Sequence, residues 1–159
     1  MKRLLILVCI LALLLSLPGG TAVAKPEEAT FTITGYATSY TYEIRPNGHV
    51  KFYMTAAGYV TGYFEGTFTF DEEGEVEVLP PFPPGIPGKG KSEGIMTITT
   101  DRGQVVIKFH GKSEYVTTWG KFDVKHKEGT GDYQGLHGNG DYTGDAGFFF
   151  TVVFDGKFH

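Results

Sequence analysis

The feature that most constrains this chain is a strict alternation of residue types that continues through most of the sequence after residue 25. In residues 58–70, GYVTGYFEGTFTF, the even positions hold glycine, valine or phenylalanine, and the odd positions hold tyrosine, threonine or glutamate. Successive side chains of a β-strand point to opposite faces, so this pattern predicts one long strand with an apolar face and a polar face. Residues 114–127 alternate in the same way and predict a second long strand.

Shorter alternating segments predict further strands, and turn-forming residues separate them. Turns are expected at Pro46-Asn47-Gly48, at residues 71–74, at Asp101-Arg102-Gly103 and at Gly111-Lys112. No helical periodicity follows residue 25. The remaining expected strands cover residues 30–36, 40–45, 50–55, 94–100, 104–110, 138–143 and 147–154.

Short turns between consecutive strands favour antiparallel hairpins, and this number of strands suits a barrel or a sandwich. Glycine alternates with phenylalanine on one face of the longest segment. Curved strands need small residues where backbones crowd and large residues to fill the lumen, so this face favours a barrel. The sequence therefore predicts an all-β protein built as one antiparallel eight-stranded barrel over residues 25–159.

We expect the glycine, phenylalanine and valine face to point inward because it is the apolar one. Glu65 and Asp123 then face solvent. Such a lumen suits an apolar small molecule, or equally a fully packed core, which is common in small eight-stranded barrels. The expected lumen residues are Tyr40, Tyr42, Phe64, Phe68, Met96, Ile98, Val116 and Phe122.

The first 24 residues have the three parts of a secretory signal peptide. Lys2 and Arg3 precede an apolar run over residues 4–17, and the triplet Ala22-Val23-Ala24 ends the segment. The apolar run is shorter than the roughly 20 residues that span a bilayer. We therefore expect cleavage after residue 24 and a secreted, periplasmic or cell-exterior protein, with an uncleaved anchor as the alternative.

Charge and cysteine content exclude several classes of function. Without Lys2 and Arg3, 12 basic residues stand against 18 acidic ones, a net charge of −6, which argues against a nucleic-acid partner. Cys9 is the only cysteine and lies in the signal peptide, so thiol catalysis and thiolate metal sites are excluded from residues 25–159. Charged residues on the expected outward faces, such as Glu43 and Lys121, argue against membrane insertion after cleavage.

A proline-rich segment, LPPFPPGIPGKGKSEG over residues 79–94, interrupts the strand pattern. Proline removes ladder donors, so this segment cannot be a central strand. We expect a stiff extended loop on which Phe82 and Ile86 pack down. It is either a structural crossover or a lid over the mouth of the barrel.

Residues 129–145, GTGDYQGLHGNGDYTGD, are rich in glycine and raise the question of a ligand loop. A phosphate loop would need a Gly-Lys-Ser/Thr ending, which is absent, and dinucleotide patterns break at Gln134 and Thr143. A faint likeness to calcium-binding nonapeptide repeats occurs only once, whereas such repeats bind in tandem. The segment is therefore interpreted as structural, and no cofactor is expected.

The same segment resembles the C-terminal signature of allene oxide cyclase-like barrel domains, a group that includes dirigent proteins and bacterial families of unknown function. Residues 66–70 are similar to the central strands of these domains, and the resemblance covers residues 30–154. It implies an eight-stranded antiparallel barrel that is often trimeric. The residues that carry the signature are Gly129, Thr130, Gly131, Tyr133, Gly135, Leu136, Gly138, Gly140 and Tyr142.

The resemblance implies little about activity. The plant cyclases of this group isomerise a fatty-acid epoxide, and dirigent proteins steer the radical coupling of phenols. The catalytic motif of neither group can be placed on this chain, so no catalytic residue is carried over.

The histidines do not form an evident metal site in the sequence. His110 and His126 are expected at opposite ends of a hairpin, whereas His49 and His137 lie in turns and His159 is terminal. A metal site needs two or three ligands together, so we predict none. His126 continues the apolar face of its strand, where it either caps the strand end or orients a ligand.

Residues 148–154, FFFTVVF, are apolar on both faces. A strand buried on both sides needs a second surface besides the lumen, and a bare one would be prone to aggregation. We expect a homo-oligomer, with a trimer favoured, to cover it. The alternative cover is the proline-rich loop.

These patterns support two hypotheses of different classes. The first is a non-catalytic exported barrel that binds a small apolar ligand or has a structural role. The second is an isomerase or cyclase acting on a hydrophobic molecule inside the lumen, which would require a buried ionisable group beside a cavity. The candidate ligand-binding residues are Tyr40, Tyr42, Phe64, Met96, Phe122 and His126.

Overall fold

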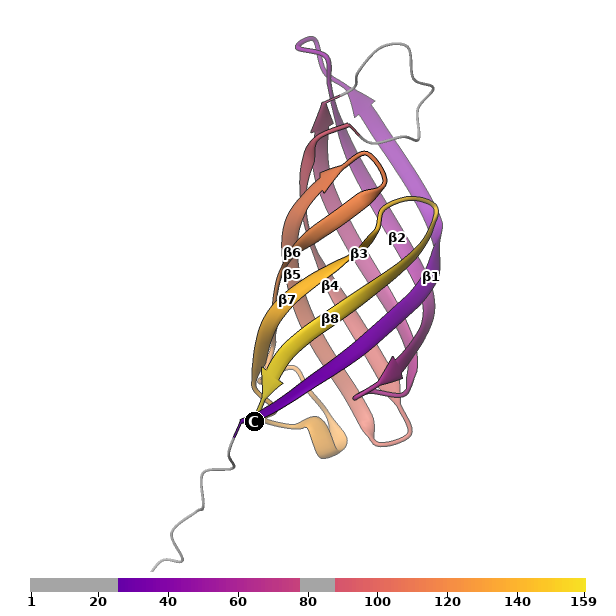
Figure 1. Cartoon of the computed structure of the whole chain (residues 1–159). Helices are drawn as coiled ribbons and strands as arrows, with labels where there is room; N and C mark the ends of the chain where they lie inside the picture. Colours follow the sequence, from indigo (N-terminus) through magenta and orange to yellow (C-terminus); the bar gives the residue numbers. More distant parts are fainter. Residues whose placement is uncertain (1–25, 78–87) are drawn as a thin grey trace, which may run out of the picture.

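The computed structural model describes residues 26–77 and 88–159, which form a closed barrel of eight antiparallel strands (Figure 1). Each strand pairs with the next along the chain, and β8 pairs with β1, so the sheet has no free edge. The predicted all-β antiparallel barrel is confirmed, whereas the expected signal peptide lies outside the described residues. The elements are β1 (Glu27–Ile44), β2 (His49–Gly62), β3 (Gly66–Glu77), β4 (Gly90–Thr100), β5 (Gly103–Glu114), β6 (Thr117–Val124), the 3-10 turn η1 (Gly131–Tyr133), β7 (Gly138–Asp145) and β8 (Phe149–Phe158).

The apolar face of the alternating pattern points into the barrel, as predicted. Phe68, Met96 and Ile98 are almost completely buried, whereas Glu65 and Asp123 are exposed. In the described residues no helix is long and apolar enough to cross a membrane.

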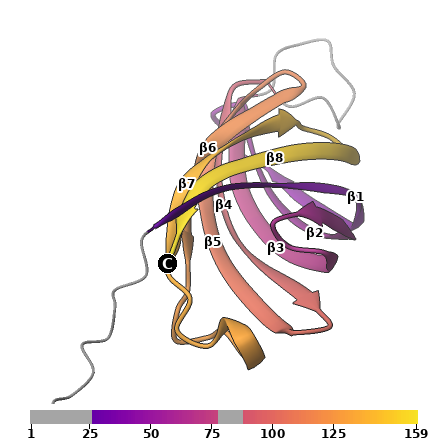
Figure 2. The same ribbon diagram turned by 60° about the horizontal axis from the view of Figure 1, so that its bottom comes forward.

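Aromatic side chains fill one end of the lumen. This end of the barrel holds the C-terminus and η1, as Figure 2 shows. Phe31 lies at the centre, with its ring stacked 4.7 Å from Phe154 and edge-on to Phe64 at 5.1 Å between centroids. Phe122 and Phe158 also contact Phe31, at 6.0 Å and 6.3 Å. We call these five residues the aromatic plug. Edge-to-face and offset pairs of this kind add to the free energy of apolar burial.

The single long strand expected over residues 58–70 is wrong, because β2 ends at Gly62 and β3 begins at Gly66. Gly62 has a φ of +105°, a backbone conformation that favours glycine and ends the strand. Phe64 then turns into the plug and is fully buried. The alternation continues through the turn because the turn also places one apolar side chain inward.

Two other expected turns are strand instead. The ladder between β2 and β3 continues without a break to His49 and Glu77, so residues 71–74 belong to β3. The turn expected at Gly111-Lys112 lies in β5, and the hairpin closes at Tyr115 and Val116. Val116, expected in the lumen, is consequently 60% exposed at this turn.

Two glycines in β5 and β6 serve packing rather than turning. Gly111 and Gly120 are directly paired, and a Cβ atom on Gly120 would lie 2.7 Å from a ring carbon of Tyr142. The lack of a side chain therefore lets this tyrosine lie flat across both strands. The hairpin could not turn here without displacing that ring.

Two predicted segments change their bounds. The strands expected over 30–36 and 40–45 are one strand, β1, with a register shift between Ala37 and Ser39. The proline-rich loop expected over 79–94 is shorter, because β4 begins at Gly90. Residues 78–87, which include Phe82 and Ile86, lie outside the described residues, so the crossover and lid interpretations both stay predictions.

The glycine-rich segment forms η1, a short connection and β7. Gly131 and Gly135 have φ angles of +61° and +82°, so both occupy the left-handed region. Tyr133 is buried beside the plug at 5.6 Å from Phe64, and Leu136 packs against the core. The segment closes the plugged end of the barrel.

The assignment of strand faces is tested by two matched substitutions in β4. Ile98 is fully buried, whereas Ile95 is 47% exposed on the opposite face. We expect Ile98→Ala to lower the free energy of unfolding by about 2–5 kcal/mol, because it leaves a cavity in the core. Ile95→Ala should lower it by less than about 1 kcal/mol. Equal losses in chemical denaturation would contradict the assignment.

Candidate ligand-binding site

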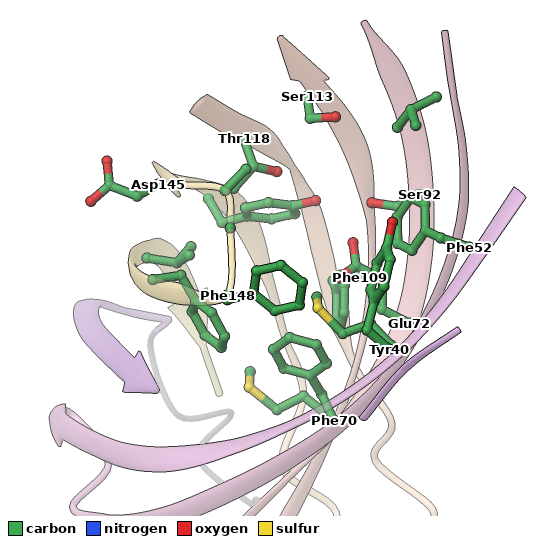
Figure 3. A pocket seen from close by; sticks show the side chains of 18 of the residues that line it. Tyr40, Phe52, Phe70, Glu72, Ser92, Phe109, Ser113, Thr118, Asp145 and Phe148 are labelled. Atoms are coloured by element: carbon green, nitrogen blue, oxygen red, sulfur yellow. The ribbon is translucent and has the colours of Figure 1, made fainter. Parts of the chain in front are cut away.

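A cavity of about 230 Å³ occupies the half of the lumen opposite the aromatic plug (Figure 3). The ends of β1, β3, β5 and β7 and the starts of β2, β4, β6 and β8 surround it, together with the connection between β7 and β8. Most of its wall is apolar. The residues that dominate the wall are Tyr40, Tyr42, Phe52, Met54, Phe70, Phe109, Tyr142, Phe148 and Phe150.

The register shift in β1 explains why two tyrosines enter the lumen. Before the shift the odd positions are buried, as Phe31 and Ile33 show. One extra residue between Ala37 and Ser39 reverses the alternation, so Tyr40 and Tyr42 line the cavity. A bulge of this kind re-aims the side chains that follow it.

Small residues on the opposite wall leave the space open. Ser92 in β4, Ser113 in β5 and Thr118 in β6 line the cavity where the plugged half carries phenylalanine. Gly111 and Gly120 lie between them and carry no side chain. The cavity is thus open because the residues at these inward positions are small.

Glu72 is the central polar residue of the cavity. It follows Phe68 and Phe70 on the inward face of β3, is partly buried, and lies next to Tyr40 in Figure 3. Asp145, at the end of β7, is the other acidic residue of the wall and is exposed. Among the described residues, no lysine, arginine or histidine lines the cavity.

Burial changes the acid–base properties of this cavity. Removal from water raises the pKa of Glu72, and a hydrogen bond with Ser92 acts in the opposite direction. Burial also raises the pKa of Tyr40, with smaller contributions from Tyr42 and Glu72. For Tyr142, burial and the nearby Glu72 raise the pKa to about 12. The site therefore holds a carboxyl group that resists ionisation beside two phenols that stay neutral.

The structure brings together only part of the predicted ligand-binding set. Tyr40, Tyr42 and Met96 line the cavity. Phe64 and Phe122 lie in the packed plug instead, because phenylalanines from five positions fill that end of the lumen. Whether any of these residues binds a ligand stays a prediction.

His126 lies near the plugged end, away from the cavity. β6 ends at Val124, so His126 lies in the connection after it, with its ring 4.2 Å from that of His137. The ring of His159 also stacks on that of His137, at 5.5 Å between centroids, and the backbones of His137 and His159 exchange two hydrogen bonds of 2.9 Å. The sequence did not predict this cluster. The described residues contain no group of three side chains arranged to hold a metal ion.

The sequence analysis does not place Glu72 in the lumen, because it predicts a turn at residues 71–74. The signal was present in the parity of the strand: Phe68, Phe70, Glu72 and Val76 are all even positions of one alternating segment. Extending the strand past Phe70 would have placed a carboxyl group on the apolar face.

The raised pKa of Glu72 predicts a pH-dependent effect on stability. Because the folded pKa is above the unfolded one, stability is highest below the ordinary glutamate range and falls as pH rises to the folded pKa. Glu72→Gln removes this loss. We expect the variant to gain stability over the parent near pH 8, by about 1.4 kcal/mol for each unit of pKa shift.

The gain should disappear toward pH 4, where both states of the parent are protonated. Thermal unfolding of both proteins across this range measures the difference. Glu65→Gln, at an exposed carboxyl group, is the control and should show no such trend. A gain that is independent of pH would contradict the assignment to Glu72.

No protein-family model matches the sequence, and a comparison with curated proteins finds no match. A functional assignment therefore rests on the geometry and chemistry of the barrel itself. The candidate site is the apolar cavity with Glu72 on its wall.

Proposed function

We propose that this protein is an exported β-barrel that binds a small, largely apolar molecule in the open half of its lumen and does not transform it. The observation that carries the proposal is the cavity of about 230 Å³, whose wall is mostly aromatic and aliphatic. Ligand sites typically combine such a wall with a few polar groups that orient the ligand. Here Glu72, Ser92, Ser113 and Thr118 supply those groups.

The mouth of the cavity also supports binding of an apolar molecule. Ile44 ends β1, Val116 lies in the turn between β5 and β6, and Phe148 lies in the connection between β7 and β8; all three side chains are exposed. An apolar rim lowers the cost of moving an apolar molecule from water into the lumen. A purely structural role would require neither the hollow nor this rim.

We also propose that the chain is an allene oxide cyclase-like barrel. The closed eight-stranded antiparallel topology and the position of the glycine-rich segment at one end of the barrel support this relationship. It remains a proposal about ancestry. It assigns no substrate and no catalytic residue.

One observation favours the second hypothesis, an isomerase or cyclase that acts on a hydrophobic molecule in the lumen. Glu72 is an ionisable group with a raised pKa beside a cavity, and such groups serve in general acid–base catalysis. Tyr40 and Tyr142 could donate hydrogen bonds to a developing oxyanion. Conversion of a bound compound by the parent protein, but not by Glu72→Gln, would favour this hypothesis.

We propose that the protein forms a homo-oligomer through the outer face of β8, β1 and β2. Phe149 is 83% exposed and pairs directly with Tyr36, while Tyr59 lies nearby on β2 and is 71% exposed. A cluster of exposed aromatic residues is typical of an interaction surface. A second and third copy of the chain would cover it and explain the apolar character of both faces of β8.

Binding in the lumen is tested by two neighbouring substitutions in β6. Thr118 lines the cavity, whereas Thr117 is exposed on the opposite face. We expect a neutral, environment-sensitive dye to bind the parent and Thr117→Trp alike. Thr118→Trp should weaken dye binding by about tenfold or more, because an indole ring occupies the cavity.

A second measurement identifies the natural ligand. Protein secreted by its own host is denatured, extracted with organic solvent and analysed by mass spectrometry. A stoichiometric apolar molecule is the expected result. Absence of any extracted molecule, together with no dye binding by the parent, would contradict the proposed function.

The oligomer is tested by sedimentation velocity. Phe149→Glu places a charge in the exposed aromatic cluster and should yield a monomer, because burying an unpaired charge is costly. Ile95→Glu, on the outer face of β4, is the matched control and should sediment as the parent does. A monomeric parent protein would contradict the oligomer.

A further inference from the structure

We propose that the ligand is an apolar organic cation, a molecule whose protonated amine pairs with the Glu72 carboxylate inside the aromatic wall of the cavity. This inference rests on the proposed function and names the chemical class of its ligand. Three observations support it: the charged residues that line the cavity, the ion pairs of other acidic residues on β3, and the aromatic rings around Glu72.

Glu72 has no basic partner among the described residues, although two of the acidic residues that follow it on β3 do. Glu73 pairs with Lys51 at 3.2 Å, and Glu75 pairs with His49 at 3.1 Å. Those residues point outward, where Lys51 and His49 of β2 meet them. Within the same described residues, Asp71 and Glu77 also form no ion pair, but both are exposed to solvent, whereas Glu72 points into the lumen.

The part of the chain that the structure describes supplies no cation to the cavity. Of the described residues that form its wall, Glu72 and Asp145 are the charged ones, and both are acidic. A carboxylate removed from water is costly unless an opposite charge accompanies it. A ligand that brings a positive charge satisfies Glu72, whereas a fatty acid or another anion would add repulsion.

Aromatic rings surround the carboxyl group of Glu72. Tyr40 stacks on Phe52 at 5.9 Å between centroids and contacts Tyr42 at 6.1 Å and Phe148 at 5.5 Å. The faces of aromatic rings attract ammonium groups, and a carboxylate among such rings is the chemistry by which proteins hold organic cations. An apolar amine matches the charge and the wall together.

The proposal includes a dependence on pH. The titratable groups that face Glu72 are Tyr40 and Tyr42 of β1 and Tyr142 and Asp145 of β7. Among the described residues, β2, β4, β5, β6 and β8 contribute only uncharged side chains to the wall. Burial raises the pKa of Tyr40 and of Tyr142, so these two phenols stay neutral while Glu72 titrates. Binding of a permanent cation should therefore strengthen as pH rises and Glu72 ionises, with release of its proton to the solvent.

The test uses four compounds of equal chain length: octylamine, octyltrimethylammonium, octanol and octanoate. Each displaces the neutral dye from the parent protein, from Glu72→Gln and from the control Glu65→Gln at pH 8. We expect both cations to bind the parent and the control about tenfold or more tightly than octanol, with octanoate the weakest. In Glu72→Gln this preference for the cations should disappear while octanol binding is kept.

A measurement on the parent alone keeps the inference testable should the variant fail to fold. Between pH 4 and pH 8 the affinity for octyltrimethylammonium should rise, whereas that for octanol should not. Equal or tighter binding of octanol or octanoate, or a flat pH profile for the cation, would overturn the inference while dye binding leaves the proposed function standing. If neither the dye nor any of the four compounds binds, the proposed function itself fails.

Discussion

Closure of the barrel is the constraint on which the rest of this structure depends. Because β8 pairs with β1, every backbone ladder is satisfied and the lumen has a fixed width. The interior must then be filled by side chains from inward positions alone. Glycines lie where rings cross the sheet, such as Gly120 beneath Tyr142, and phenylalanines fill the plug around Phe31.

The two halves of the lumen are filled differently. The aromatic plug buries its rings completely and ties β1, β6 and β8 together through direct ring contacts. The other half has serine, threonine and glycine at equivalent inward positions and stays hollow. A barrel packed along its whole length would be more stable but would hold no ligand. The plug thus supplies the rigidity that an open cavity at the other end requires.

Glu72 links the proposed binding role with its enzymatic alternative. An unpaired carboxyl group on an otherwise apolar wall destabilises the empty protein whenever it ionises, which is why its pKa is raised. A bound organic cation would offset that cost, and a bound neutral substrate would find a proton donor. Both proposed functions use the carboxyl group of Glu72. In the first, the ligand brings a positive charge to the ionised carboxylate; in the second, the ligand receives a proton from the neutral carboxyl group.

The sequence by itself determined the barrel class and its inward face, because the period-two alternation of residues such as Val60, Phe68 and Phe70 depends only on local backbone geometry. It also indicated Tyr40, Tyr42 and Met96 as cavity residues. Only the tertiary structure decided where strands end and which inward residues meet. The turn at Gly62, the continuation of β3 through Glu72 and the stack of His126 on His137 all depend on long-range pairing. Local alternation continues unchanged through the tight turn at Gly62, so it cannot show which segments the closed sheet brings side by side.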